Sequence, residues 1–290
     1  MRHRPQRLAV TLTLTAATCV AMPLGGVPAD ASPMRESAVA APPPAPRGHP
    51  DFNGIVALNN CSGSIVRWQA SKPGDKALML TNGHCTKFYG ADEVDVDVPL
   101  ERTVTLLNSD GTDRADVATT TLLYGTMDST DVSLYELSLS YAQLRSRYDV
   151  NALTVLDKEA AKHARVVIVS GYWKRAYRCH LNGFVHQVRE YVWTWDHSLR
   201  YNENGCHTIH GTSGSPILDS DTRAVIGINN TGNDDGEKCT LNNPCEVDRR
   251  GHISVYQGRD YGEQTWWFTT CLGADRRLHL DKVGCRLPSS

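Results

Sequence analysis

The chain lacks a strong excess of charge of either sign. Its 30 Lys and Arg residues nearly balance 32 Asp and Glu residues, which gives a formal charge of -2. The aromatic and basic residues do not gather into one stripe, and no RNA or DNA module is recognisable. Nothing therefore marks the chain as a partner of nucleic acids or of acidic substrates.

A long hydrophobic run is also missing. The N-terminal apolar stretch covers residues 8–22, is rich in Thr, and is shorter than the roughly 20 residues of a membrane-spanning helix. Three arginines precede it, and the sequence ADA at 29–31 fits a signal-peptidase site. We predict that residues 1–31 are a cleaved signal peptide and that the protein is secreted and extracellular, without stable membrane association afterwards. The alternatives are an uncleaved anchor and a lipid anchor on Cys19.

Paired C-x-x-C motifs are absent, which disfavours a zinc site; the one tight Cys/His cluster is CHTIH at 206–210. Nine cysteines are present, and Cys19 leaves with the signal. An even number then remains, as is typical of disulfides in an exported chain. These are Cys61, Cys85, Cys179, Cys206, Cys239, Cys245, Cys271 and Cys285.

Helical periodicity is scarce, and no internal repeat is visible. The best helical candidate, residues 152–164, is either one helix or a loop between two halves. Short β-type runs dominate, and turn residues separate them as in an antiparallel barrel or sandwich. The runs lie at 64–68, 77–80, 94–98, 102–107, 132–137, 165–169, 188–195, 215–218, 224–229 and 251–256.

The composition divides the chain into segments. Residues 32–50 are rich in Ala and Pro and predict a disordered pro-segment or linker. Two β halves follow at 51–150 and 151–260, and a tail closed by a disulfide occupies 261–290. Its WWF cluster (266–268) predicts core packing against the second half, with a surface platform for polymer or cell wall as the alternative.

The segment GTSGSP at 211–216 contains a candidate nucleophile. Ser213 has a glycine two positions before it and another directly after it. Glycine permits the tight turn that exposes a serine oxygen and points backbone N–H groups at a substrate carbonyl. A serine hydroxyl is a poor nucleophile near neutral pH, so it needs an adjacent base.

Two further segments supply candidates for a base and an acid. His84 in LTNGHC (80–85) follows an apolar strand, and histidine has a pKa suited to proton transfer. Asp131 in TDVSLYEL (130–137) precedes an alternating strand and is the preferred carboxylate to orient the imidazole. Asp116 is a rival, and Asp128 is a weaker third choice.

Together these segments resemble the chymotrypsin-like (trypsin-like) serine peptidase family, especially bacterial secreted members related to the glutamyl endopeptidases. NGHC at 82–85 is similar to the family's A-A-H-C motif, with both alanines replaced, and GTSGSP is similar to its G-x-S-G-[GS]-P motif. CSGS at 61–64 resembles the strand that precedes the histidine. The resemblance covers about residues 55–232.

The resemblance implies an all-β fold of two perpendicular six-stranded antiparallel barrels with the active site in the cleft between them. It implies a triad of His84, Asp131 and Ser213, with an oxyanion hole formed by the N–H groups of Gly211 and Ser213. The expected activity is hydrolysis of peptide bonds by a serine endopeptidase. The expected partners are protein or peptide substrates, the chain is expected to be monomeric, and neither a cofactor nor a metal is required.

The same resemblance suggests where substrate specificity resides, because the family's primary pocket uses residues before the nucleophile and the strand after it. This predicts substrate contacts for His207, Thr208, Asn229 and Asn230. Trypsin-type members have an Asp six residues before the serine, where this chain has His207, so strict Arg or Lys preference is not expected. Glutamate-preferring members have a histidine near Asn229, which is missing here, although His207 or His210 could substitute.

The family also pairs the cysteines equivalent to Cys61 and Cys85. For the remaining six, proximity suggests Cys239 with Cys245 and Cys271 with Cys285, which leaves Cys179 with Cys206. A Cys206–Cys239 bridge is the main competitor.

Two other functions stay open. An inactive homologue could bind proteins or cell-wall polymer, although all three catalytic residue types are present. An esterase of the α/β-hydrolase fold would place the serine first and use a G-x-S-x-G turn, whereas here the serine comes last and Pro216 follows closely.

Overall fold

The computed structural model describes residues 50–201 and 206–289. The predicted signal peptide (1–31) and all but the last residue of the predicted linker (32–50) lie outside the described residues. Within the described part of the chain, no helix has the length and apolar character needed to cross a membrane.

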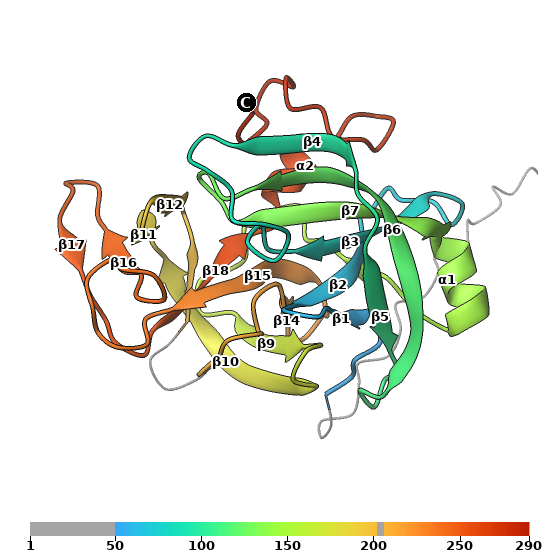
Figure 1. The fold of residues 1–290 in the computed structure, drawn as a ribbon, viewed down its shortest axis with the longest axis horizontal. Coiled ribbons are helices and arrows are strands. Elements are labelled where there is room, and N and C mark those ends of the chain that lie inside the picture. The colour runs from blue at the N-terminus through green and yellow to red at the C-terminus, as the bar shows by residue number, and fades with distance from the viewer. Residues whose placement is uncertain (1–49, 202–205, 290) are drawn as a thin grey trace, which may run out of the picture. The chain divides into compact units, whose positions relative to one another are not determined.

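Six antiparallel strands form the first barrel (Figure 1). They are hydrogen-bonded in the order β1-β5-β6-β7-β3-β2, and pairing of β1 with β2 closes the ring. The strands are β1 (Ile55–Ala57), β2 (Ser62–Arg67), β3 (Lys76–Thr81), β5 (Thr103–Leu107), β6 (Asp113–Thr126) and β7 (Val132–Ser140). Two short strands extend it, β4 (Val94–Pro99) along β6 and β8 (Leu153–Thr154) parallel to β2.

A second closed barrel of six strands follows in the order β10-β13-β18-β15-β14-β9. The strands are β9 (Arg165–Ser170), β10 (Arg175–Phe184), β13 (Leu199–Tyr201), β14 (Pro216–Asp219), β15 (Val225–Gly232) and β18 (Asp260–Gln264). Alternate residues of β10 are buried, as a strand with one face on a core requires. The predicted fold of two six-stranded barrels is therefore confirmed.

A separate sheet lies at the left of Figure 1, with the strand order β12-β11-β16-β17. It contains β11 (Gln187–Glu190), β12 (Trp193–Asp196), β16 (Cys245–Val247) and β17 (Ile253–Ser254). The run predicted as one strand at 188–195 is thus a hairpin. It turns at Tyr191, whose φ of 51° breaks the extended conformation.

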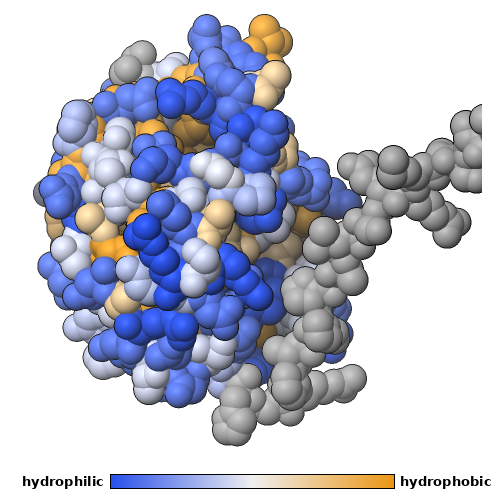
Figure 2. All heavy atoms as spheres, turned by 90° about the vertical axis from the view of Figure 1, so that its right-hand side faces the viewer, coloured by the Kyte–Doolittle hydropathy of each residue, from blue (hydrophilic) through white to orange (hydrophobic). Residues whose placement is uncertain are grey.

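Helices are few in the described residues. The candidate at 152–164 is a loop that includes β8, and the helix α1 (Tyr141–Tyr148) lies before it. Ser140 and Gln143 form a capping box at the start of α1, and Asp149 ends it in the left-handed conformation. Helix α1 was not predicted from the sequence, although the S-x-x-Q pattern at 140–143 is typical of the start of a helix. The face that carries α1 is largely hydrophilic and shows only small apolar areas (Figure 2).

The aromatic cluster in the C-terminal segment packs into the core. Trp267 and Phe268 are buried in helix α2 (Trp267–Thr270). The ring of Phe268 lies 6.0 Å from that of Trp68 and 5.9 Å from that of Tyr124, measured between centroids. Both partners come from the first-barrel half. The same core cluster contains Val225 and Ile228 of the second barrel, so the predicted core packing against that half is confirmed and extends to the first.

Four disulfides join the eight cysteines of the described residues. The pairs are Cys61–Cys85, Cys179–Cys206, Cys239–Cys245 and Cys271–Cys285. Cys206 bonds to Cys179, so the competing Cys206–Cys239 bridge does not form.

Candidate active site

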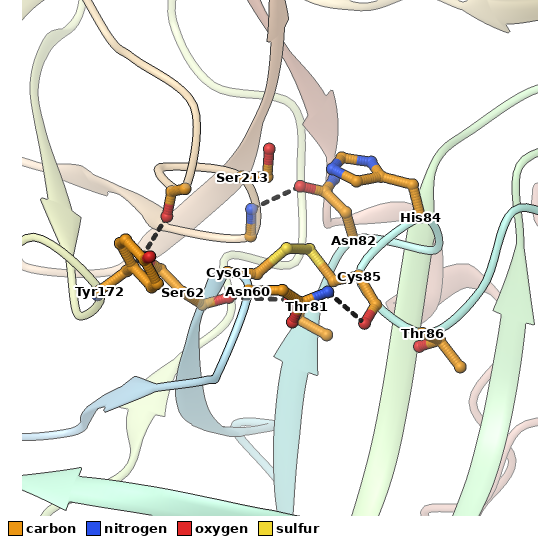
Figure 3. Close-up of a disulfide and its surroundings, with 12 residues drawn as sticks. Asn60, Cys61, Ser62, Thr81, Asn82, His84, Cys85, Thr86, Tyr172 and Ser213 are labelled. Carbon is orange, nitrogen blue, oxygen red and sulfur yellow. Dashed lines mark hydrogen bonds between the residues drawn. A yellow bond between two sulfur atoms is a disulfide. The ribbon is translucent and has the colours of Figure 1, made fainter.

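His84 lies on the loop that follows β3. The Cys61–Cys85 disulfide ties this loop to the segment before β2, and Asn60 donates a side-chain hydrogen bond to the carbonyl of Cys85. Figure 3 shows His84 and Ser213 beside this disulfide. The imidazole is therefore attached to a covalently constrained loop.

Asp131 holds His84 through two contacts. Its Oδ2 lies 2.6 Å from His84 Nδ1, and its Oδ1 accepts the backbone N–H of His84 at 2.9 Å. The Asp131 side chain is fully buried, whereas that of His84 is 21% exposed. Burial alone would lower the pKa of His84, but the charge and hydrogen bond of Asp131 outweigh it, so this pKa is raised.

The rival carboxylates lie elsewhere. Asp116 is on β6, where it accepts a hydrogen bond from Thr105 Oγ1 at 2.7 Å. Asp128 precedes Asp131 in a turn, and burial raises the pKa of its carboxyl group. Of the three carboxylates, the structure brings Asp131 to His84.

Gly83 makes the close approach of these segments possible. A Cβ at this position would lie 2.1 Å from the carbonyl oxygen of Thr126 and 2.8 Å from Asp131 Oδ1. Any side chain would push the loop of His84 away from the carboxylate.

The turn of Ser213 is built from glycines. Gly211 and Gly214 have φ values of 87° and 75°, in the region that favours glycine. The carbonyl of Ser213 accepts the N–H of Ser62 at 2.8 Å, which joins the turn to the first barrel. This anchors the predicted nucleophile next to the strand that precedes the histidine loop.

The hydroxyl of Ser213 donates to the carbonyl of Asn230 at 3.2 Å. No hydrogen bond joins this hydroxyl to His84. Both side chains, together with Asp131, line one cleft of about 370 Å³. A rotation about the Ser213 side-chain bond is a low-cost motion, and catalytic hydrogen bonds often form only when substrate is bound.

The turn fixes the directions of two backbone N–H groups, those of Gly211 and Ser213, through hydrogen bonds to the carbonyls of the preceding residues. The carbonyl of His210 accepts the indole N–H of Trp173 at 2.6 Å, and that of Thr212 accepts the N–H of Ser215 at 3.0 Å. Because each peptide is planar and trans, the N–H groups of Gly211 and Ser213 point in the opposite directions. Neither donates a hydrogen bond to a described residue, so both remain available as donors.

The sequence did not reveal two buried side chains that connect the barrels. Asn82 donates from Nδ2 to the carbonyl of Asp131 at 2.7 Å, and its Oδ1 accepts the N–H of Gly214, as Figure 3 shows for the second contact. Glu263 on β18 accepts from Asn230 Nδ2 at 2.8 Å and from Thr130 Oγ1 at 3.2 Å.

Glu263 is fully buried among these partners. Burial raises the pKa of its carboxyl to about 8, although the Asn230 hydrogen bond pulls it down. The group is therefore mostly protonated at neutral pH. The sequence offered no clear signal for this residue, because the run DYGEQ is polar apart from Tyr261 and Gly262, and its burial is evident only in the structure.

The predicted substrate contacts divide into two groups. Thr208, Asn229 and Asn230 line the cleft, whereas His207 is exposed and is not among its lining residues. The Asn229 side chain donates to Thr212 Oγ1 at 3.1 Å and accepts from Thr208 Oγ1 at 3.3 Å. Asn229 therefore holds Thr208 and Thr212, two residues that line the cleft, in position.

Among the described residues, one group of side chains has the spacing of a metal site. Ligand atoms of Cys61, His84 and Cys85 lie within 4.8 Å of one another. Both sulfurs are in the disulfide, however, so neither is available as a thiolate ligand.

Comparison with known proteins gives one family match. The model of the trypsin-like peptidase domain matches residues 61–228, more than half of the chain. No curated protein matches the chain in sequence.

Several solved structures are similar to the chain. The active form of the Rv3671c protease from M. tuberculosis is 14% identical, with a TM-score of 0.45 over 87% of this chain and 96% of that chain. The MamO protease domain from Magnetospirillum magneticum is 13% identical, with a TM-score of 0.45 over 74% of this chain and 94% of that chain. Thermobifida fusca protease A is 16% identical, with a TM-score of 0.41 over 74% of this chain and 90% of that chain.

Proposed function

The chain belongs to the family of trypsin-like peptidase domains, and we propose that it is a secreted serine endopeptidase acting through an acyl-enzyme. The observation that carries the proposal is the 2.6 Å contact between His84 Nδ1 and Asp131 Oδ2, in a cleft that Ser213 also lines. This contact leaves Nε2 of the same imidazole as the proton acceptor.

In the proposed reaction, the Ser213 hydroxyl leaves the Asn230 carbonyl and donates to His84 Nε2. Its oxygen attacks the carbonyl carbon of the scissile bond while the proton moves to the imidazole. The C–N bond then breaks, and the imidazolium returns that proton to the leaving amine. Water repeats the sequence on the acyl-enzyme, releasing the carboxylic acid and restoring Ser213.

The remaining groups stabilise charge. Asp131 stabilises the imidazolium and fixes the ring orientation, because it also holds the backbone of His84. The free N–H groups of Gly211 and Ser213 stabilise the negative oxygen of the tetrahedral intermediate. The reaction needs no cofactor.

Secretion forms part of the proposal. Four disulfides in the described residues support folding in an oxidising compartment. The N-terminal basic and apolar segments support export, as does the ADA sequence at 29–31.

The test is turnover by a Ser213→Ala variant of the purified protein. We expect kcat on a peptide substrate to fall at least about a thousandfold while the thermal unfolding midpoint stays near that of wild type. Ser220→Ala, at an exposed position beyond β14, is the matched control and should retain activity. Equal turnover by wild type and Ser213→Ala would reject the assignment. Absence of peptide turnover by folded wild type on a diverse library would favour the inactive homologue.

A further inference from the structure

The cleft that contains Ser213 is acidic. No lysine or arginine is among the described residues that line it, whereas four carboxylates are. They belong to Asp131, Glu190, Asp234 and Asp260. An acidic cleft favours a cationic ligand, but only a carboxylate with a free oxygen can bind one directly.

Two of these carboxylates use both oxygens within the fold, and a third, Asp234, is exposed and pairs through one oxygen. Asp131 binds His84, and the exposed Asp234 lies 2.9 Å from His210 Nε2. The oxygens of Glu190 accept from Thr231 Oγ1 and from the N–H of Asn242. These contacts occupy both oxygens of Glu190 within the fold.

Asp260 differs from the others. It is 8% exposed, and its Oδ2 accepts the backbone N–H of Thr208 at 2.9 Å. Its Oδ1 accepts no hydrogen bond from any described residue. Although the residue as a whole is largely buried, Oδ1 is not among the buried side-chain atoms without a partner, so this oxygen is reachable from the cleft that Asp260 lines.

Gly232 keeps the space beside this oxygen open. It pairs with Asp260 across β15 and β18, and a Cβ on Gly232 would lie 2.2 Å from Asp260 Oδ1. Gly232 is not among the residues with positive φ, so its backbone conformation does not demand glycine. The close carboxylate is the reason that a side chain is excluded at this position.

We propose that Asp260 determines specificity by binding, through Oδ1, the cationic side chain of a Lys or Arg residue on the acyl side of the scissile bond. This proposal rests on the proposed peptidase function. Asp260 binds the segment before Ser213, through Thr208, and pairs with the strand after it, through Gly232. The expectation that Lys and Arg are not preferred rested on His207 alone, whereas the carboxylate of Asp260 comes from β18.

The test compares peptides that differ only in the residue on the acyl side of the cleaved bond. For wild type we expect kcat/KM to be about ten- to hundredfold higher for Lys or Arg than for uncharged norleucine, the range of a hydrogen bond to a charged group. In Asp260→Asn, this preference should fall to about threefold or less while norleucine cleavage persists. Asp235→Asn removes one exposed charge outside the cleft lining and should preserve the preference.

A measurement on wild type alone covers the case in which Asp260→Asn does not fold. Burial raises the pKa of Asp260 to about 7, opposed by its Thr208 hydrogen bonds and reinforced by the charge of Asp234. Tyr177 and Tyr201 also face this carboxyl, and burial raises the pKa of both hydroxyls, so they stay neutral here. The Lys-to-norleucine ratio of kcat/KM cancels the titration of His84, and it should decrease as the pH falls through about 7.

The outcomes separate this inference from the proposed function. If wild type cleaves peptides but prefers acidic or uncharged side chains, or if folded Asp260→Asn keeps the Lys preference, the role of Asp260 is wrong and the peptidase assignment stands. A pH-independent ratio likewise contradicts the role of Asp260. If wild type cleaves none of the peptides, the proposed function itself fails.

Discussion

Asn82 donates a hydrogen bond from Nδ2 to the carbonyl of Asp131 at 2.7 Å, inside the interface between the two barrels. The other end of its side chain accepts the N–H of Gly214, the residue after Ser213. Asn82 is fully buried. One amide group therefore connects the residue that orients the base with the turn of the nucleophile.

Replacing Asn82 with Ala should reduce kcat about tenfold while KM changes by less than about twofold. The lost hydrogen bonds are each worth about 1 kcal/mol, and the groups affected position the catalytic side chains without touching substrate. Steady-state kinetics on one peptide give both constants. Asn108→Ala, in the connection between β5 and β6, is the control. An unchanged kcat in folded Asn82→Ala contradicts the positioning role.

Gly83→Ala should be strongly destabilising and should inactivate the protein. The new Cβ would lie 2.1 Å from the carbonyl oxygen of Thr126, so the loop of His84 must move. Gly74→Ala is the matched control, since no atom lies within 4 Å of its added Cβ and its φ is not positive. Denaturant unfolding of both variants tests this expectation. Similar unfolding midpoints for the two would show that the loop accommodates the methyl group.

Asp131→Asn should change both the rate and its pH dependence. In wild type, kcat/KM should rise with pH as His84 loses its proton, with a midpoint above 6.5, because Asp131 raises this pKa. Without the carboxylate, the burial of His84 lowers the midpoint, and the loss of ring orientation reduces kcat by about 10⁴ near neutral pH. A pH–rate profile for each protein measures both effects.

Asp116→Asn is the control for that profile. Asp116 binds Thr105 on the surface of β6, so its replacement should leave the midpoint and kcat close to wild type. A large loss in Asp116→Asn combined with a small one in Asp131→Asn would reverse the assignment of the acid.

Glu263→Gln should stabilise the protein relative to wild type increasingly as the pH rises. The pKa of Glu263 is about 8 in the folded protein and about 4.5 in an unfolded chain. Since the unfolded state releases this proton first, wild type loses stability progressively between these values, whereas Gln has no proton to lose. Urea unfolding of both proteins at pH 5 and pH 8 gives the difference. A difference that is equal at both pH values would show that Glu263 does not titrate as described.

Local sequence patterns predicted the elements that depend on neighbouring residues. The apolar strand before His84 and the glycines around Ser213 were visible because each pattern lies within a few residues. Strand β6 was missed, since the many charged residues and threonines among residues 113–121 obscure the alternation of apolar and polar side chains. Strand β4 was predicted correctly, but Val96 and Val98 are exposed rather than on a buried face.

The contributions of β18 could not be predicted in this way. Asp260 and Glu263 contact residues of β15 about 30 positions earlier, through a pairing whose register shifts between Asn229 and Thr231. No local pattern specifies such a register. The same limit explains why His207, chosen by its distance from Ser213 in sequence, lies outside the lining of the cleft while Asp260 lies within it.

The central claim is that His84 activates Ser213 across the shared cleft. Mass spectrometry after treatment with a serine-directed fluorophosphonate tests it most directly, using wild type and a folded His84→Ala variant. We predict a single adduct on Ser213 in wild type and labelling at least about a hundredfold slower in His84→Ala. No adduct on Ser213, or equal labelling rates in the two proteins, would contradict the claim.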